Sequence, residues 1–200
     1  MKKVSDIHAI KIIFFITACY VGLWTIRIPT IKDQLQTDYI GVGYIMLSFA
    51  IGSIVAMIFA NGLILKTSTK SILTYTLIAE GCLWLPVPFI NELWIFMIFS
   101  FVFGMSYGAF EIACNVYASN LEVREKRSMM SGFHAFWSLG VLFGSLFTSF
   151  FLEWNYSFIF NILIYVIILL PLSMYFVFCL ESQVEEKTED LSKKNIFFIW

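Results

Sequence analysis

Six long apolar stretches constrain the fold of this chain more than any other feature of its sequence. Each approaches or exceeds the roughly 20 apolar residues that an α-helix needs to cross the hydrocarbon core of a bilayer. Because 60% of the 200 residues are hydrophobic and only 14% are charged, a water-soluble fold of this size is excluded. The sequence therefore predicts an all-α membrane protein with six transmembrane helices, at residues 9–28, 40–65, 71–89, 93–118, 129–152 and 157–180.

The first stretch is predicted to stay in the protein as an uncleaved span. It follows two lysines, as a secretory signal would, but it is longer than the apolar region of a signal peptide and no small-x-small cleavage site follows it. Three of the four prolines lie near predicted span ends, where a proline breaks little, and Pro171 lies inside the sixth span. The four cysteines lie in apolar stretches without metal-ligand spacing, so we expect no metal site and no cofactor.

Lysine and arginine are distributed unevenly between the two sides of the predicted bundle. Eleven of the 13 fall on the side that holds the N-terminus, and only Arg27 and Lys32 fall on the other. Loops rich in Lys and Arg are retained in the cytoplasm. We therefore expect a multi-pass protein of the plasma (inner) membrane, with both ends of the six-span unit in the cytoplasm.

The chain divides into three parts by composition. Residues 1–180 form the predicted six-helix bundle, and residues 181–194, with five acids and three lysines, form a cytoplasmic polar linker. Residues 195–200 are apolar again but far too few to cross a bilayer, so we interpret them as the start of an incomplete seventh span. The alternative is an interfacial anchor with Trp200 at the level of the lipid headgroups.

Polar side chains inside the spans are the candidates for function, because lipid cannot satisfy them and they normally face the bundle or a wet cavity. In the fourth span Tyr107, Glu111 and Asn115 recur every four residues and share one helix face. Glu111 lies too deep for a short carboxylate to reach the membrane surface. His134 of the fifth span lies at a similar depth, so the two side chains can pair, which suits a group that binds and releases protons.

The first span carries a second polar stripe, at a helical spacing of three, four and three residues. Its members are Thr17, Tyr20, Trp24 and Arg27. We expect this face to line a cavity, although Trp24 and Arg27 can equally be anchors at the membrane interface. Glu80, well inside the third span, is a further proton-binding candidate or a residue that hydrogen-bonds to a neighbouring helix.

Small residues recur at the spacing that lets membrane helices approach closely. The pairs are Ser48 and Gly52, Gly104 and Gly108, and Gly140 and Gly144. The segment 104–108 also matches the G-x-S-x-G pattern of serine hydrolases and, with His134 downstream, resembles an intramembrane serine protease of the rhomboid type. That family takes its histidine from the sixth span, where this chain offers only Asn161, and Ser106 faces away from the Glu111 stripe. We therefore predict that the protein is not an enzyme and keep the protease as an alternative.

Two blocks of the sequence resemble transporters of the major facilitator superfamily, in the bacterial group related to the fucose permease. The first block is Trp24, Arg27, Pro29 and Ile31, followed by Gly43 and Gly52; the second is Glu111, Asn115, Met130, Ser131, Phe133, His134, Trp137, Ser138 and Gly140. The loop between the second and third spans departs from the family, because it keeps basic residues but lacks the expected acid. The chain also has six of the family's twelve spans.

The resemblance implies the N-terminal six-span half of a secondary transporter, built from two inverted three-helix repeats. In this interpretation Glu111 is the proton-coupling carboxylate, Tyr107 and Asn115 contact the solute, and His134 tunes Glu111. The implied substrate is a small organic solute such as a sugar, and the other partners are protons, the lipid bilayer and a second six-span half or a second copy, with no nucleic acid. The alternatives are a non-transporting remnant of a truncated gene and the protease.

Overall fold

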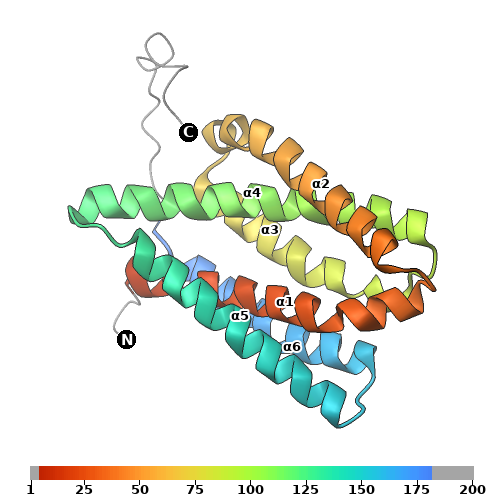
Figure 1. Cartoon of the computed structure of the whole chain (residues 1–200). Coiled ribbons are helices and arrows are strands. Elements are labelled where there is room, and N and C mark those ends of the chain that lie inside the picture. Colours follow the sequence, from red (N-terminus) through yellow and green to blue (C-terminus); the bar gives the residue numbers. More distant parts are fainter. Residues whose placement is uncertain (1–4, 182–200) are drawn as a thin grey trace.

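The computed structural model describes residues 5–181, in which six long helices and one short 3₁₀ turn follow one another (Figure 1). All six are long and apolar enough to cross a membrane, the third when the residues up to Phe89 are included. They are α1 (Asp6–Gln34), α2 (Tyr39–Lys66), α3 (Thr69–Trp84), α4 (Leu93–Glu125), α5 (Met130–Glu153) and α6 (Phe158–Cys179), with the turn η1 at Val87–Phe89. The predicted seventh span and all of the predicted linker beyond Glu181 lie outside the described residues.

Helices α1 and α4 continue beyond the apolar stretches that predicted them. Pro29 was expected near the end of its span, but it lies inside α1, which ends only at Gln34. A single proline removes one backbone hydrogen bond without necessarily ending a helix. Helix α4 has 33 residues, or about 50 Å at 1.5 Å per residue, which exceeds the roughly 30 Å of a hydrocarbon core. Hydropathy therefore located the membrane-crossing part of these helices rather than their ends.

Polar side chains define where several helices begin. Asp38 accepts a hydrogen bond from the backbone nitrogen of Gly41 at 2.9 Å, and this contact caps α2. Ser68 caps α3 in the same way, through the nitrogen of Ser71 at 3.1 Å. Ser157 caps α6. These caps satisfy backbone N–H groups that have no partner within the first turn of a helix.

The packing of the helices repeats itself between the two halves of the chain. Helix α1 lies along α5 as α4 lies along α2, and α3 packs on α4 as α6 packs on α1. If α1 is exchanged with α4, α2 with α5 and α3 with α6, each of these packing pairs becomes another pair of the same set. Helix α1 begins where α4 ends, since Asp6 Oδ2 lies 2.8 Å from Arg124 Nη1, so matched helices run in opposite directions. This is the arrangement expected of two inverted three-helix repeats.

Glycines allow the two main helix pairs to pack closely. We call these contacts the α1–α5 seam (Gly22, Gly140 and Gly144) and the α2–α4 seam (Gly52, Gly104 and Gly108). At each of these glycines a Cβ atom would overlap backbone atoms of the partner helix. The small-residue pairs at 104 and 108 and at 140 and 144 are thus confirmed as packing contacts.

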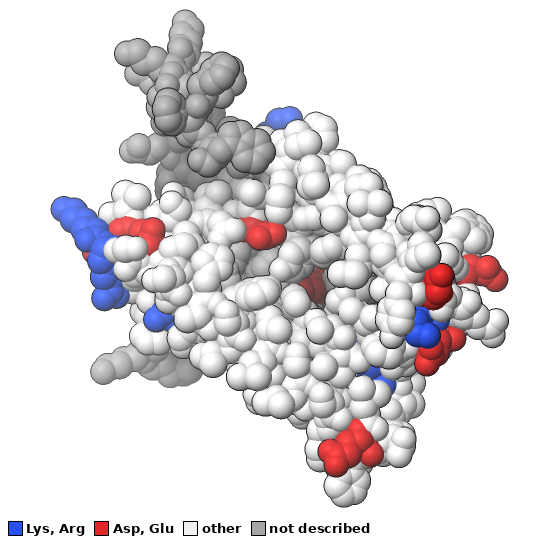
Figure 2. Space-filling model, viewed as in Figure 1, with Lys and Arg blue, Asp and Glu red and all other residues white. Residues whose placement is uncertain are grey.

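Charged side chains gather at the two ends of the bundle, and its middle is nearly free of them (Figure 2). We call one end the basic end; it holds Lys11, Lys66, Lys70, Arg124, Lys126 and Arg127. Both ends of the six-helix unit meet there, because the backbone nitrogen of Glu181 donates to Asp6 Oδ1 at 3.1 Å. Lys70 Nζ also donates to the carbonyl oxygen of Leu180 at 2.6 Å.

Candidate functional site

A pocket of about 170 Å³ lies between α1, α4 and α5. Its lining combines aromatic rings with a carboxylate, an amide and an imidazole: Phe14, Tyr107, Phe110, Glu111, Cys114, Asn115, His134 and Trp137. Four of these residues, Tyr107, Glu111, Asn115 and His134, were candidates from the sequence. The pocket is therefore the place where polar groups of the membrane-spanning part of α4 and α5 come together.

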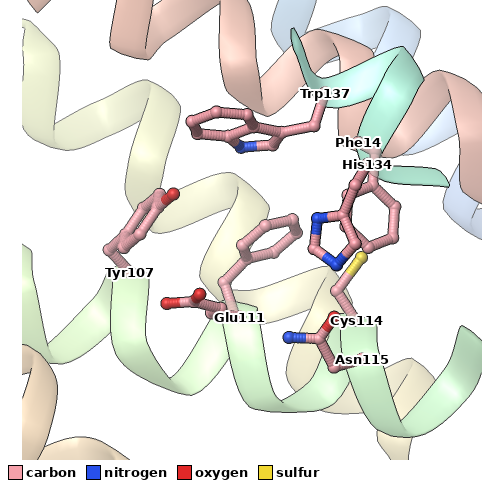
Figure 3. Close-up of a pocket in the computed structure, with 8 residues that line it drawn as sticks. Phe14, Tyr107, Glu111, Cys114, Asn115, His134 and Trp137 are labelled. Carbon is pink, nitrogen blue, oxygen red and sulfur yellow. The ribbon is translucent and has the colours of Figure 1, made fainter. Parts of the chain in front are cut away.

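Helix α4 contributes its polar residues to the pocket as one row. The spacing of four residues keeps Tyr107, Glu111 and Asn115 on the same side of the helix, and all three project into the pocket (Figure 3). Trp137 and His134 project toward them from α5. An aromatic wall opposite a row of polar groups suits a solute that has both apolar and hydrogen-bonding parts.

Glu111 and His134 line the same pocket without bonding to each other. No hydrogen bond or ion pair joins Glu111 to any residue in the described range 5–181, although His134 lies close enough to interact with it electrostatically. The His134 ring instead packs edge-on against Phe14, with 5.7 Å between the ring centres. The direct pair considered from the sequence is thus not formed, and both side chains remain available to a ligand.

Asn115 presents a polar atom that the described protein leaves unsatisfied. Its Oδ1 atom is buried and accepts no hydrogen bond from residues 5–181. Buried polar atoms in folded proteins are normally hydrogen-bonded, and an unpaired one raises the energy of the site. A solute that donates a hydrogen bond to Asn115 would remove this penalty.

The stripe on α1 does not reach the pocket. Tyr20 lies in the interior, where its ring stacks on Trp84 of α3 at 6.1 Å and contacts Tyr165 of α6 at 5.9 Å. Thr17 is fully buried, and its hydroxyl group donates to the carbonyl oxygen of Ile13. Half-buried Trp24 packs on Trp84 and Phe96. The spacing correctly placed these residues on one face, but that face packs against α3 and α6.

Arg27 lies inside the bundle and is not an interfacial anchor. Only 2% of its surface is exposed, its Nε atom donates to Asn161 Oδ1 at 3.0 Å, and its guanidinium group lies 5.2 Å from the ring centre of Phe158. An arginine at the membrane surface would keep its charged group in water. The contact with Asn161 joins α1 to α6, so Arg27 has a packing partner that its sequence context did not reveal.

Glu80 is also buried, but it does not line the pocket. It is 5% exposed and has no hydrogen-bond or ion-pair partner among residues 5–181. The hydrogen bond to a neighbouring helix that the sequence suggested is therefore not present.

Several lining residues carried no functional signal in the sequence. Phe14, Phe110 and Cys114 are apolar residues within apolar helices, where nothing distinguishes a pocket wall from a lipid contact. Trp137 belongs to the second resembling block but was not a site candidate. Such residues become recognisable only when the packing of α1, α4 and α5 is known.

The G-x-S-x-G segment has no hydrolase geometry around it. Ser106 does not line the pocket that contains His134, and no hydrogen bond joins the two side chains. Its flanking glycines, Gly104 and Gly108, are used in the α2–α4 seam. A serine nucleophile requires a base within hydrogen-bond reach, which the described residues do not supply.

Comparison with known proteins agrees with the fold. An uncharacterized MFS-type transporter of Yersinia pestis is 28% identical over 145 residues, which are 71% of this chain and 37% of that protein. An uncharacterized transporter of Sinorhizobium fredii is 25% identical over 141 residues, 66% of this chain and 35% of that protein. The chain thus spans little more than a third of these relatives, and no solved structure is significantly similar to it. The profile of the Major Facilitator Superfamily matches residues 12–198, so the chain belongs to this family of membrane transporters.

Proposed function

We propose that this chain forms the N-terminal six-helix half of a proton-coupled transporter for a small organic solute. The observation that carries the proposal is the pocket, which gathers Glu111, Asn115, Tyr107 and His134 inside the membrane-spanning part of the bundle. Membership of the family supports a transporter rather than an enzyme. The resemblance to the group related to the fucose permease favours a sugar-like solute.

Each polar group of the pocket has a distinct role in this proposal. Glu111 binds and releases the coupled proton, because a carboxylate in the membrane interior changes its charge by taking up a proton. Asn115 and Tyr107 hydrogen-bond to the solute, and Trp137 stacks on its apolar face. His134 tunes the charge of Glu111 from across the pocket. The 11 to 2 distribution of basic residues supports a cytoplasmic basic end in the inner membrane.

Transport requires a second six-helix bundle in this proposal. The relatives are more than twice as long as the part that this chain matches, and alternating access needs one bundle to move against another around a shared site. Further residues of a longer chain, a separate chain or a second copy can supply that bundle. The competing explanation is a six-helix bundle that does not take part in transport.

Reconstitution into proteoliposomes tests the proposal. Uptake of radiolabelled monosaccharides is measured under an imposed proton gradient, for the chain alone and for the chain co-expressed with a second six-span bundle of the family. Glu111→Gln should abolish gradient-driven uptake, because the amide cannot bind the proton. Glu153→Gln is the matched control, since Glu153 is an exposed glutamate at the end of α5.

Three outcomes would contradict the proposal. Uptake that persists in Glu111→Gln would exclude Glu111 as the coupling carboxylate. Uptake by a strict monomer of the chain alone would show that no second bundle is required. Absence of uptake in every combination of chain and partner would favour a bundle that does not take part in transport.

A further inference from the structure

A second carboxyl group lies buried outside the pocket that holds the proposed proton-coupling group. Glu80 of α3 is 5% exposed and forms no hydrogen bond or ion pair within residues 5–181. Acidic side chains are visible in the otherwise uncharged middle of the molecule, one of them recessed in a hollow (Figure 2). A buried carboxyl group without a cation is far more stable with its proton than as a bare anion.

The titratable groups around Glu80 are weak acids. Helix α1 presents Cys19 and Tyr20, and α4 presents Tyr107 and Cys114; all four interact electrostatically with Glu80. On α3 itself Cys82 follows two residues later, and Tyr165 of α6 contacts Tyr20. None of these groups is a cation, so nothing among them holds Glu80 permanently in its charged form.

Tyr20 and the Trp84 ring that stacks on it carry hydrogen-bond donors that lack acceptors. The hydroxyl group of Tyr20 and the indole nitrogen of Trp84 are buried, and neither bonds to another described residue. Their rings are stacked at 6.1 Å with an angle of 14° between the planes. Donors close to a carboxyl group stabilise its ionised form. The donors of Tyr20 and Trp84 thus favour release of the proton from Glu80, whereas the burial of Glu80 favours its retention.

Glu80 and Glu111 share two neighbours on α4. Tyr107 and Cys114 interact electrostatically with both carboxyl groups, and both line the pocket that contains Glu111. Each glutamate therefore acts electrostatically on the same two side chains, and groups linked in this way can titrate as a set.

We propose that Glu80 is a second proton-binding site, which takes up and releases one proton in competition with Glu111. When Glu80 loses its proton and Glu111 gains one, no other bond changes and the summed charge of the two groups stays the same. The proposal deepens the proposed function, on which its role in transport rests, but proton binding itself can be measured without any solute.

Labelling with a hydrophobic carbodiimide tests the proposal on the purified chain in lipid nanodiscs. This reagent modifies protonated carboxyl groups in apolar surroundings, and peptide mass mapping identifies the modified residue. In the wild-type chain we expect label at Glu80 that declines as the pH rises. In Glu111→Gln the pH of half-labelling at Glu80 should fall by a measurable amount, because a nearby negative charge has been removed. Glu153→Gln should leave the profile unchanged.

The wild-type profile alone can overturn the proposal, so the result does not depend on the folding of a variant. Absence of label at Glu80 at every pH, or a level of label that does not change with pH, would contradict proton exchange there. An unchanged profile in Glu111→Gln would contradict the competition between the two sites. Since no solute is involved, labelling can succeed where the uptake experiment fails, and the two proposals are thus tested separately.

Discussion

Gly104 of α4 faces Phe49 of α2 so closely that a Cβ atom at position 104 would overlap the carbonyl oxygen of Phe49. Backbone atoms cannot move aside as the end of a flexible side chain can. We expect Gly104→Ala to separate the two helices locally and to lower stability by about 1–3 kcal/mol, the usual range for overpacking. Thermal unfolding in detergent measures the effect.

Gly43 supplies the matched control for this substitution. It lies on α2 as well, but a Cβ atom there would meet nothing within 4 Å. Gly43→Ala should therefore leave stability unchanged or raise it slightly, since alanine favours a helix over glycine. Equal destabilisation by the two substitutions would show that the α2–α4 seam does not determine the effect.

The contact between Arg27 and Asn161 predicts strong coupling between two helices. In Asn161→Leu the buried guanidinium group loses its acceptor, which should cost about 1–3 kcal/mol. The double variant Arg27→Met with Asn161→Leu should cost less than the sum of the two single variants, because it leaves no unpaired polar group. A double-mutant cycle on thermal stability measures the coupling.

The exposed ion pair between Lys32 and Asp33, also on α1, serves as the reference for the buried contact of Arg27. Lys32 Nζ and Asp33 Oδ1 lie 2.8 Å apart, but the Asp33 side chain is 74% exposed. Asp33→Asn should change stability by less than about 1 kcal/mol. Additive effects of the Arg27 and Asn161 substitutions would contradict a direct interaction between them.

Glu122 should stabilise the start of α5. Its Oε1 atom accepts hydrogen bonds from the backbone nitrogens of Met129 and Met130, the latter at 2.7 Å. Glu122→Ala removes these two hydrogen bonds, and we expect the first turn of α5 to become less stable. Glu125→Ala is the comparison, since Glu125 makes only an exposed pair with Arg124 at 3.4 Å. Hydrogen exchange in the first turn of α5 should increase in the former variant alone.

Single cysteines at the two ends of the bundle test the orientation. We expect Lys126→Cys, at the basic end, to be protected from a membrane-impermeant maleimide in intact cells, and Asn91→Cys, before α4, to react. The native cysteines are replaced first, because Cys82 is exposed. Labelling of both positions from the same side of the membrane would contradict the six-span topology, and labelling only at position 126 would reverse the proposed orientation.

Ser106 should be dispensable for chemistry. An active-site-directed fluorophosphonate is expected to leave the protein unlabelled, and Ser106→Ala should retain any transport that the assembled protein shows. Labelling that disappears in Ser106→Ala would instead establish a serine hydrolase.

Hydropathy was sufficient to predict the six helices, because each contains a long and mostly apolar run. It could not predict their ends: α4 continues as far as Glu125 through residues that no longer need to be apolar. The inverted repeat came from the resemblance, and no pattern in the residues themselves indicated that α1 would pack along α5. Packing of this kind depends on the side-chain surfaces of both partners.

The site was predictable where a polar residue interrupts an apolar helix. The row of Tyr107, Glu111 and Asn115 was found from its spacing, and the comparison of depths placed His134 beside it. The same reasoning grouped the residues of α1 but assigned them to a cavity, because periodicity shows which residues share a face and not which helix covers that face. The pairing of Arg27 with Asn161, 134 positions apart, is likewise a product of the tertiary fold.

The two glycine seams make the bundle stiffer within two helix pairs than between them. Within each seam, backbone lies against backbone. The pair of α1 and α5 should therefore move as one rigid unit, and so should the pair of α2 and α4. Contacts between the two units are sparse, since α1 touches α4 and α4 touches α5 at few places. The pocket lies at this boundary. A molecule bound in the pocket would therefore lie at the less tightly packed boundary, between α4 on one side and α1 and α5 on the other.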